Sequence, residues 1–174
     1  MKLIFVMVVI TVLELTQGKI ALSRNRGAVC PSGWYRILDS CIWLSREKNN
    51  FEEANHHCNQ FPQSRLFEPK SRLQNDLVVT LVEMRQKEAQ YAWIGITDLL
   101  TEGTFRYLSS GKEVFFTKWT TGEPNNFYED EDCVNFLFKD RSWNDFGCSN
   151  KLHFICEIPL NDLLLRLVDN KNVL

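Results

Sequence analysis

The sequence lacks any apolar run long enough to cross a membrane. Its longest such run covers residues 3–13, whereas a spanning helix needs roughly 20 apolar residues. The run follows Lys2 and precedes Thr16 and Gly18, which stand at the two positions that a signal peptidase inspects. This arrangement is typical of a secretory signal. We therefore expect a signal peptide over residues 1–18 and a secreted, extracellular product without a membrane span.

An excess of basic residues is also missing. Lys and Arg number 20 against 22 Asp and Glu, which gives a formal net charge of −2. Nucleic-acid recognition usually shows as a basic patch, so the balance argues against a nucleic-acid partner. Hydrophobic residues make up 44% and aromatic residues 12% of the chain, enough for a packed core. We expect one ordinary domain rather than a disordered chain.

The six cysteines include no Cys-x-x-Cys pair, the spacing that structural zinc sites usually need. An even number of cysteines in a secreted chain predicts three disulfides, although spacing alone leaves fifteen connectivities open. The neighbours His56, His57 and Cys58 look like a ligand cluster. Adjacent residues on a helix point in different directions, so we expect Cys58 to be in a disulfide rather than in a metal site.

Apolar spacing predicts two helices in the first half of the domain. Phe51, Ala54, Cys58 and Phe61 fall at helical spacing after Asn49 or Asn50, either of which can cap. A second helix is predicted from the capping box of Ser71 and Gln74 to about Lys87. Its expected inner face consists of Leu73, Leu77, Leu81 and Met84.

Short strands are predicted on both sides of these helices, at residues 35–38, 41–44, 91–96, 104–108, 114–119, 133–138 and 153–157. Two helices followed by several short strands argue for an α+β fold. We divide the mature chain into an N-terminal arm (19–29), a compact domain (30–159) and a C-terminal tail (160–174).

The loops between residues 101 and 148 are rich in side-chain oxygens, at 123–126, at 129–132 and at 144–145. Calcium takes six to eight oxygen ligands from carboxylates, amides and backbone carbonyls, so these loops suit a calcium site; magnesium fits less well because it usually keeps several waters. A solvated acidic surface loop has the same composition, and composition alone leaves both readings open.

Six motifs in this order resemble the carbohydrate-recognition domain of C-type lectins, over residues 30 to about 159. They are Cys-Pro-x-Gly-Trp at 30–34, Phe-Glu-Glu-Ala at 51–54, Trp-Ile-Gly-Ile at 93–96, Glu-Pro-Asn at 123–125, Trp-Asn-Asp at 143–145 and Phe-Ile-Cys-Glu at 154–157. The resemblance implies the long form of a double-loop α+β fold with long calcium-binding loops and a cis bond between Glu123 and Pro124. It also implies the disulfides Cys30–Cys41, Cys58–Cys156 and Cys133–Cys148.

The resemblance further implies a principal calcium site that binds sugar directly. Its residues in this sequence are Glu123, Asn125, Glu131, Asn144 and Asp145. In the family two vicinal sugar hydroxyls complete the coordination of the ion. The order Glu-Pro-Asn, rather than Gln-Pro-Asp, is the mannose type, so the expected partners are glycans with mannose, N-acetylglucosamine, glucose or fucose.

An auxiliary calcium site is implied by the same resemblance. It would use Asp98, Glu102, Asn126, Glu131 and Asp132. The alternative is that Asp98 and Glu102 cap a turn. Phe127, which follows the site, either contacts the apolar face of a sugar or packs the loop.

Two classes of function remain open: a secreted calcium-dependent lectin, or a structural or interaction protein of the same fold, such as a perlucin-like shell-matrix protein or a venom-type ligand. No Ser-His-Asp, Cys-His or open zinc arrangement is legible, so we do not expect an enzyme. In the tail, Leu160, Leu163, Leu164, Leu167 and Val168 recur at helical spacing. The tail either docks this apolar face on its own domain, remains a frayed end, or uses the face to form a homo-oligomer.

Overall fold

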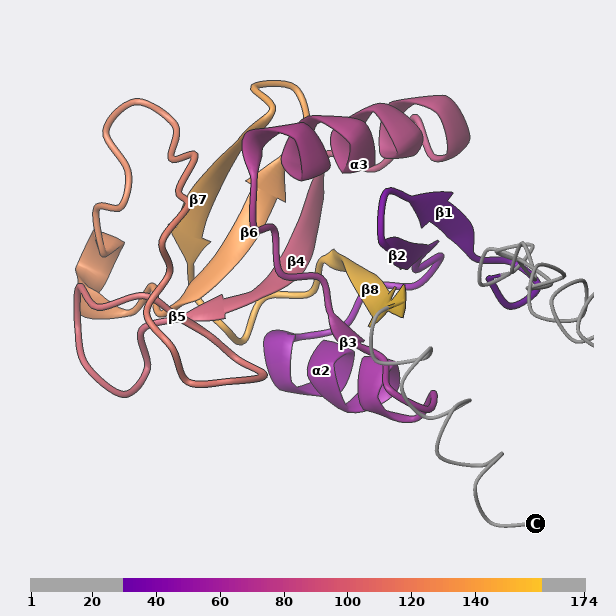
Figure 1. Ribbon diagram of the computed structural model, residues 1–174. Helices are drawn as coiled ribbons and strands as arrows, with labels where there is room; N and C mark the ends of the chain where they lie inside the picture. The colour runs from indigo at the N-terminus through magenta and orange to yellow at the C-terminus, as the bar shows by residue number, and fades with distance from the viewer. Residues whose placement is uncertain (1–29, 161–174) are drawn as a thin grey trace, which may run out of the picture.

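The computed structural model describes residues 30–160, which form a twisted sheet with one helix on each side (Figure 1). The predicted signal peptide, the N-terminal arm and tail residues 161–174 lie outside the described residues. The helices are α2 (Phe51–Asn59), α3 (Arg72–Arg85) and the short 3-10 helix η1 (Phe127–Glu129). The strands are β1 (Tyr35–Ile37), β2 (Ser40–Leu44), β3 (Arg65–Leu66), β4 (Tyr91–Thr97), β5 (Arg106–Tyr107), β6 (Cys133–Leu137), β7 (Ser142–Phe146) and β8 (His153–Pro159).

The strands follow the order β1-β2-β8-β4-β6-β7, with β3 paired to β8 and β5 paired to β4. All pairs are antiparallel except β4 with β8. The α+β fold class is therefore confirmed. The three disulfides join the cysteines that the resemblance paired, Cys30–Cys41, Cys58–Cys156 and Cys133–Cys148. Within the described part of the chain, no helix is long and apolar enough to span a membrane.

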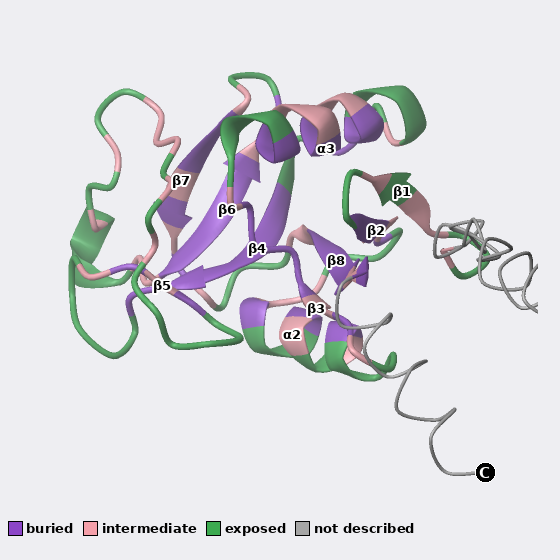
Figure 2. Cartoon of the chain, viewed as in Figure 1, coloured by how far each residue is buried: buried purple, intermediate pink, exposed green. Residues whose placement is uncertain are grey.

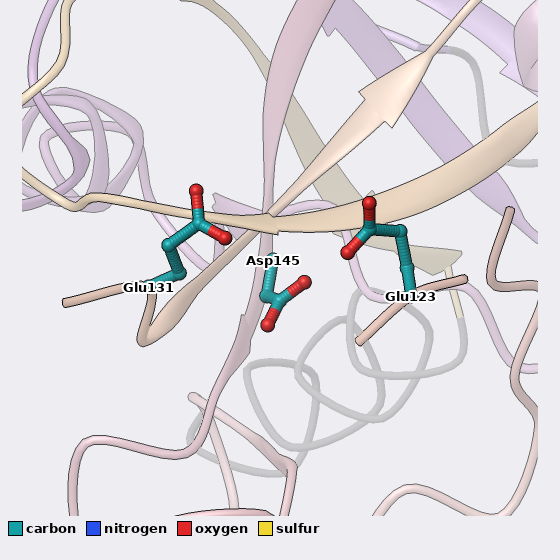
Figure 3. Close-up of side chains that lie close together, drawn as sticks. All are labelled: Glu123, Glu131 and Asp145. Carbon is teal, nitrogen blue, oxygen red and sulfur yellow. The ribbon is translucent and has the colours of Figure 1, made fainter. Parts of the chain in front are cut away.

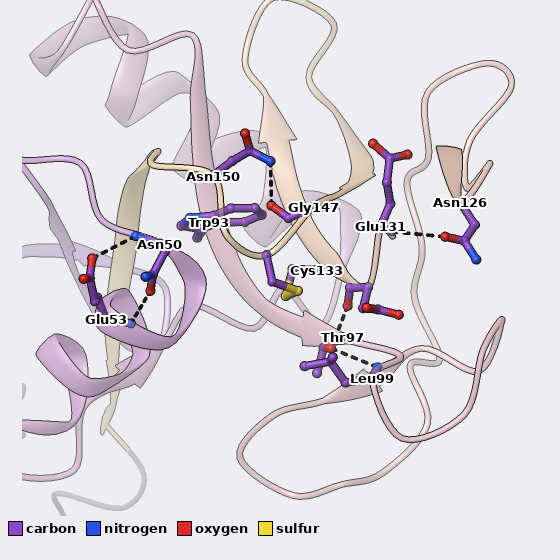
Figure 4. Close-up of a disulfide and its surroundings, with 12 residues drawn as sticks. Asn50, Glu53, Trp93, Thr97, Leu99, Asn126, Glu131, Cys133, Gly147 and Asn150 are labelled. Carbon is purple, nitrogen blue, oxygen red and sulfur yellow. Dashed lines mark hydrogen bonds between the residues drawn. A yellow bond between two sulfur atoms is a disulfide. The ribbon is translucent and has the colours of Figure 1, made fainter. Parts of the chain in front are cut away.

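Helix α2 begins where its sequence dictates. Asn50 is the N-cap: its side chain accepts the N–H of Glu53, and the Glu53 carboxylate accepts the N–H of Asn50 in return (Figure 4). This reciprocal capping satisfies two backbone donors that a helix N-terminus otherwise leaves open. Phe51, Ala54 and Cys58 are buried as predicted, whereas Phe61 lies beyond the helix and is exposed.

The predicted inner face of α3 is right at Leu81, which is buried, but wrong at Leu73 and Met84. Leu73 and Met84 are 59% and 67% exposed, and the face that packs on the sheet consists of Gln74, Asn75, Val78, Val79, Leu81 and Val82. Figure 2 shows this buried side of the helix turned toward β4 and β6. Both sets have helical spacing, so the apolar period alone could not choose between them. A buried hydrogen bond from Trp143 to Asn75 belongs to the second set.

Two further strand predictions need correction. Residues 114–119 form no strand; Trp119 makes only an isolated bridge with Trp143. Conversely, Ser142–Phe146, for which the local pattern predicts no strand, forms β7 and pairs along its whole length with β6. The sequence Trp-Asn-Asp mixes one large apolar residue with two poor strand formers. The pairing with β6, rather than local propensity, decides its conformation.

The first residue of the predicted tail belongs to the packed domain. Leu160 is 3% exposed, packs with Cys41 and Ile158, and donates its N–H to the Asp39 carbonyl at 2.7 Å.

Candidate metal centre

Three carboxylates meet where two loops approach strand β7. Among the described residues, Glu123, Glu131 and Asp145 form a group whose ligand atoms lie within 4.8 Å of one another. Glu123 belongs to the loop before η1, Glu131 to the segment that leads into β6, and Asp145 to β7 itself. Figure 3 shows the carboxyl groups of Glu123 and Glu131 directed toward the space between them, above Asp145. The peptide bond between Glu123 and Pro124 is cis, as expected.

Asp145 fixes the loop that carries the Glu-Pro-Asn motif. Its side chain is buried, and its carboxylate accepts the backbone N–H groups of Asn125 at 3.0 Å and of Asn126 at 2.8 Å. Because Asp145 lies on a paired strand opposite Val134, its position is set by the sheet. These charge-assisted hydrogen bonds thus hold the loop against strand β7.

Glu131 closes the second part of the loop. Its carboxylate accepts the N–H of Phe127 at 2.9 Å, and its own N–H donates to the side-chain oxygen of Asn126 at 3.1 Å (Figure 4). Asn126 and Tyr128 adopt positive φ angles of 44° and 59°, so this turn uses backbone conformations that are uncommon outside glycine. The side chains of the motif, not a hydrophobic core, hold the turn together.

Burial and neighbouring carboxylates raise the pKa values of Glu123 and Glu131. Burial, followed by the hydrogen bond and the charge of Asp145 and then the charge of Glu131, raises the pKa of Glu123 to about 7. Burial, with smaller effects from Asp145 and Asp130, also raises the pKa of Glu131. A bound cation reverses this effect, since it favours the ionised carboxylates.

The donor chemistry fits a hard cation such as calcium. Carboxylate oxygens are the ligands that calcium prefers, and one oxygen of Glu123, Oε2, is buried without a hydrogen-bond partner. The side-chain amide of Asn144 donates to the backbone carbonyl of Asp145, which leaves its own oxygen as an acceptor. Asn125 is exposed beside these groups.

The auxiliary set is more dispersed. Asp98 is 2% exposed; one of its oxygens accepts the N–H of Gly103 at 2.8 Å, while the other, Oδ1, is buried without a partner. Burial, and to a smaller extent the charges of Glu102 and Asp132, raise the pKa of Asp98. The side-chain oxygen of Asn126 is engaged by the N–H of Glu131. The turn-capping alternative is thus present for Asp98, and the auxiliary site stays a prediction.

Several supporting residues were not singled out from the sequence. Thr97 at the end of β4 donates its hydroxyl to the carbonyl of Asp132 at 2.6 Å, which ties the two acidic loops together (Figure 4). Gly147 lies so near the neighbouring loop that a Cβ atom would come within 3.2 Å of the Asp130 carbonyl oxygen. A glycine directly before Cys148 was the available signal for this close approach.

Comparison with known proteins identifies the family. The Lectin C-type domain matches residues 47–158. A CD209 antigen-like protein C of Mus musculus is 30% identical over 146 residues, which cover 83% of this chain and 77% of that protein. A perlucin-like protein of Mytilus galloprovincialis is 30% identical over 129 residues, covering 73% of this chain and 81% of that protein.

The solved structures agree with this assignment. The cow CD23 C-type carbohydrate-recognition domain, solved in the presence of a GlcNAc2Man3 oligosaccharide, superposes with a TM-score of 0.66 at 25% identity. The match covers 74% of this chain and 95% of that domain. This chain therefore belongs to the C-type lectin domain family.

Proposed function

We propose that the protein is a secreted, calcium-dependent lectin for mannose-type glycans, which recognises or agglutinates surfaces that carry them. The observation that carries the proposal is the group of Glu123, Glu131 and Asp145, in which a Glu123 oxygen is buried without a partner. Three carboxylates placed this closely repel one another, and a doubly charged cation removes that repulsion. The proposed ligands are Glu123, Asn125, Glu131, Asn144 and Asp145.

The side chains around the ion also define the sugar. Bound calcium would supply coordination positions for two vicinal hydroxyls. Around them, Glu123 and Glu131 accept hydrogen bonds from the hydroxyls, whereas Asn125 and Asn144 donate hydrogen bonds to them, because a carboxylate only accepts and an amide nitrogen only donates. This order suits the equatorial 3- and 4-hydroxyls of mannose and N-acetylglucosamine. The oligosaccharide named with the cow CD23 domain contains sugars of the same class.

Retention on mannose-agarose tests the proposal. The protein should be retained in calcium and released by a chelator. Asp145→Asn is the informative variant, since it removes one charge from the site at constant size. Asp140→Asn, an exposed acidic residue in the turn between β6 and β7, is the matched control. Equal retention of both variants would rule out the proposed site.

A structural or interaction role is the second candidate. Glu129 and Asp130 are exposed within the acidic run. Such a run suits contact with a mineral surface, and the chain has a perlucin-like relative. Adsorption to calcium carbonate that persists in excess free mannose, together with no retention on mannose-agarose, would favour this candidate.

Two accessory features belong to the same proposal. The auxiliary calcium site of Asp98, Glu102, Asn126, Glu131 and Asp132 would order the loop after β4, and a second calcium equivalent in a titration tests it.

Self-association through the tail would supply the avidity that one shallow site lacks. Removing residues 161–174 and measuring the mass by light scattering tests the tail, because an unchanged mass excludes it.

A further inference from the structure

Exposed apolar side chains stand on both loops that carry the proposed calcium ligands. Leu99 and Leu100, directly after Asp98, are 58% and 84% exposed. Phe127 and Tyr128, directly after Asn126, are 60% and 86% exposed, and their ring centroids lie 4.2 Å apart. Phe127 therefore contacts the neighbouring ring of Tyr128 and leaves most of its own side chain exposed. We call these four residues the apolar rim.

The two parts of the apolar rim belong to one end of the molecule. The N–H of Asp98 donates to the carbonyl of Asp132 at 3.2 Å, and Thr97 donates its hydroxyl to the same carbonyl. Figure 1 shows η1 and the loop after β4 at the same end of the molecule, away from α3 and β1. Both parts are thus held beside the carboxylate group.

All four side chains of the apolar rim are more than half exposed. Exposing large apolar side chains costs free energy, and clusters of them usually mark an interaction surface. The hydrogen bonds of Glu131 engage the N–H of Phe127 and the side chain of Asn126, the two residues directly before Tyr128, whose φ is positive. The loop therefore presents this ring to solvent through the groups that form the metal site.

We propose that the apolar rim contacts the lipid portion of membrane glycolipids whose headgroup occupies the calcium site. This inference rests on the proposed lectin function and names its ligand class. The rim consists of separate tips on two loops, interrupted by acidic residues. Such tips suit shallow insertion into a bilayer interface, where every apolar or aromatic side chain finds a partner. A protein partner would need a matching pocket for each tip.

Charge makes this contact dependent on calcium. Glu102, Glu129, Asp130, Glu131 and Asp132 lie between or beside the tips. Without a cation these carboxylates keep the loops hydrated and away from a membrane surface. Neutralisation of the carboxylate group lowers that cost, and the sugar headgroup then brings the rim to the lipid.

Vesicle binding of the full chain tests the proposal. The probe is a phosphatidylcholine vesicle with a diacylglycerol glycolipid whose mannose headgroup is attached either directly or through a long hydrophilic spacer. In calcium, the wild-type protein should bind the directly attached form about tenfold more tightly, which corresponds to about 1.4 kcal/mol. The double variant Leu100→Ser with Tyr128→Asn should lose this preference and keep its retention on mannose-agarose. Asn tolerates the positive φ at position 128, and Leu73→Ser, an equally solvent-exposed leucine on α3, is the matched control.

The outcomes separate the inference from the function on which it rests. Wild-type retention on mannose-agarose without preference between the two vesicles overturns the lipid contact alone. Loss of mannose-agarose retention in the double variant also overturns it, since the rim would then support the site itself. Weaker binding of the double variant to mannosylated albumin would indicate a protein partner instead. Absence of all calcium-dependent mannose binding in the wild type defeats the proposed function.

Discussion

The side-chain oxygen of Asn75 on α3 accepts the indole N–H of Trp143 on β7 at 2.8 Å, and both residues are fully buried. This bond links the helix to the strand that carries Asn144 and Asp145. It also explains why α3 turns Asn75 and its valines to the sheet. A polar contact in the core thus supports the position of Asp145, the member of the carboxylate group that lies on β7.

Replacing Asn75 by alanine should lower the free energy of unfolding by about 1–3 kcal/mol, because the indole N–H of Trp143 loses its acceptor in a buried environment. Urea unfolding followed by tryptophan fluorescence measures the change. Leu73→Ala on the same helix, where the side chain is 59% exposed, should stay within about 0.5 kcal/mol of wild type. Equal effects of the two variants would contradict the proposed support.

Asp145→Asn should weaken calcium binding by at least about tenfold, since the site loses one ionised ligand and the loop amides lose a charged acceptor. Calorimetric titration with calcium measures the affinity. Asp140→Asn should leave it unchanged. A circular dichroism spectrum identical to wild type is required, so that a weaker affinity is not the result of misfolding.

The double variant Glu123→Gln with Asn125→Asp should move preference from mannose toward galactose. It exchanges an acceptor for a donor on one side of the hydroxyl pair and a donor for an acceptor on the other. Competition of mannose and galactose for the immobilised sugar measures the ratio. If calcium binding persists and the mannose preference is unchanged, the assignment of these side chains to the sugar is wrong.

Calcium binding should weaken as the pH falls through about 7, because Glu123 has a raised pKa of about 7 in the metal-free protein and protons compete with the ion. The pKa of Glu131 is also raised. Titrations at about pH 8, 7, 6 and 5 test the dependence. Undiminished affinity at the lowest pH would contradict the carboxylate ligand set.

Stability without calcium should show the opposite pH dependence. In the folded protein the pKa of Glu123 lies above its ordinary value of 4.5. Its stabilising contribution to the free energy of unfolding is therefore fully present below pH 4.5 and is lost as the pH rises toward 7. The pKa of Glu157 is raised as well. The difference in stability between the wild type and Glu123→Gln therefore isolates the effect of Glu123. Thermal unfolding in a chelator measures it, and saturating calcium should reverse the sign of the difference.

Much of the fold could be predicted from local patterns. The capping residues Asn50 and Ser71, the two short strands before α2 and the run at 91–96 all have the structures expected of them. The predictions that failed concern elements whose structure depends on long-range contacts. The phase of α3 is decided by Trp143, which lies 68 residues away, and β7 forms because β6 is beside it.

The candidate site was also predicted only in part. The resemblance to C-type lectins implied Glu123, Glu131 and Asp145 as ligands of one site, and the structure brings these three together. Their hydrogen bonds to the backbone of Asn125, Asn126 and Phe127 could not be predicted, since they depend on a turn with positive φ angles at ordinary residues. Sequence patterns identify side-chain chemistry, whereas tertiary structure decides which backbone groups that chemistry holds.

The position of β8 in the sheet has a consequence for how the protein is made. Although β8 is the last strand in sequence, it lies between β2 and β4, and its Cys156 bonds to Cys58 across a separation of 98 residues. A growing chain therefore carries β2 and β4 with open edges until residue 159 has been synthesised. Open strand edges are prone to aggregate. We therefore expect the sheet and the Cys58–Cys156 disulfide to be completed only after residue 159 has been synthesised.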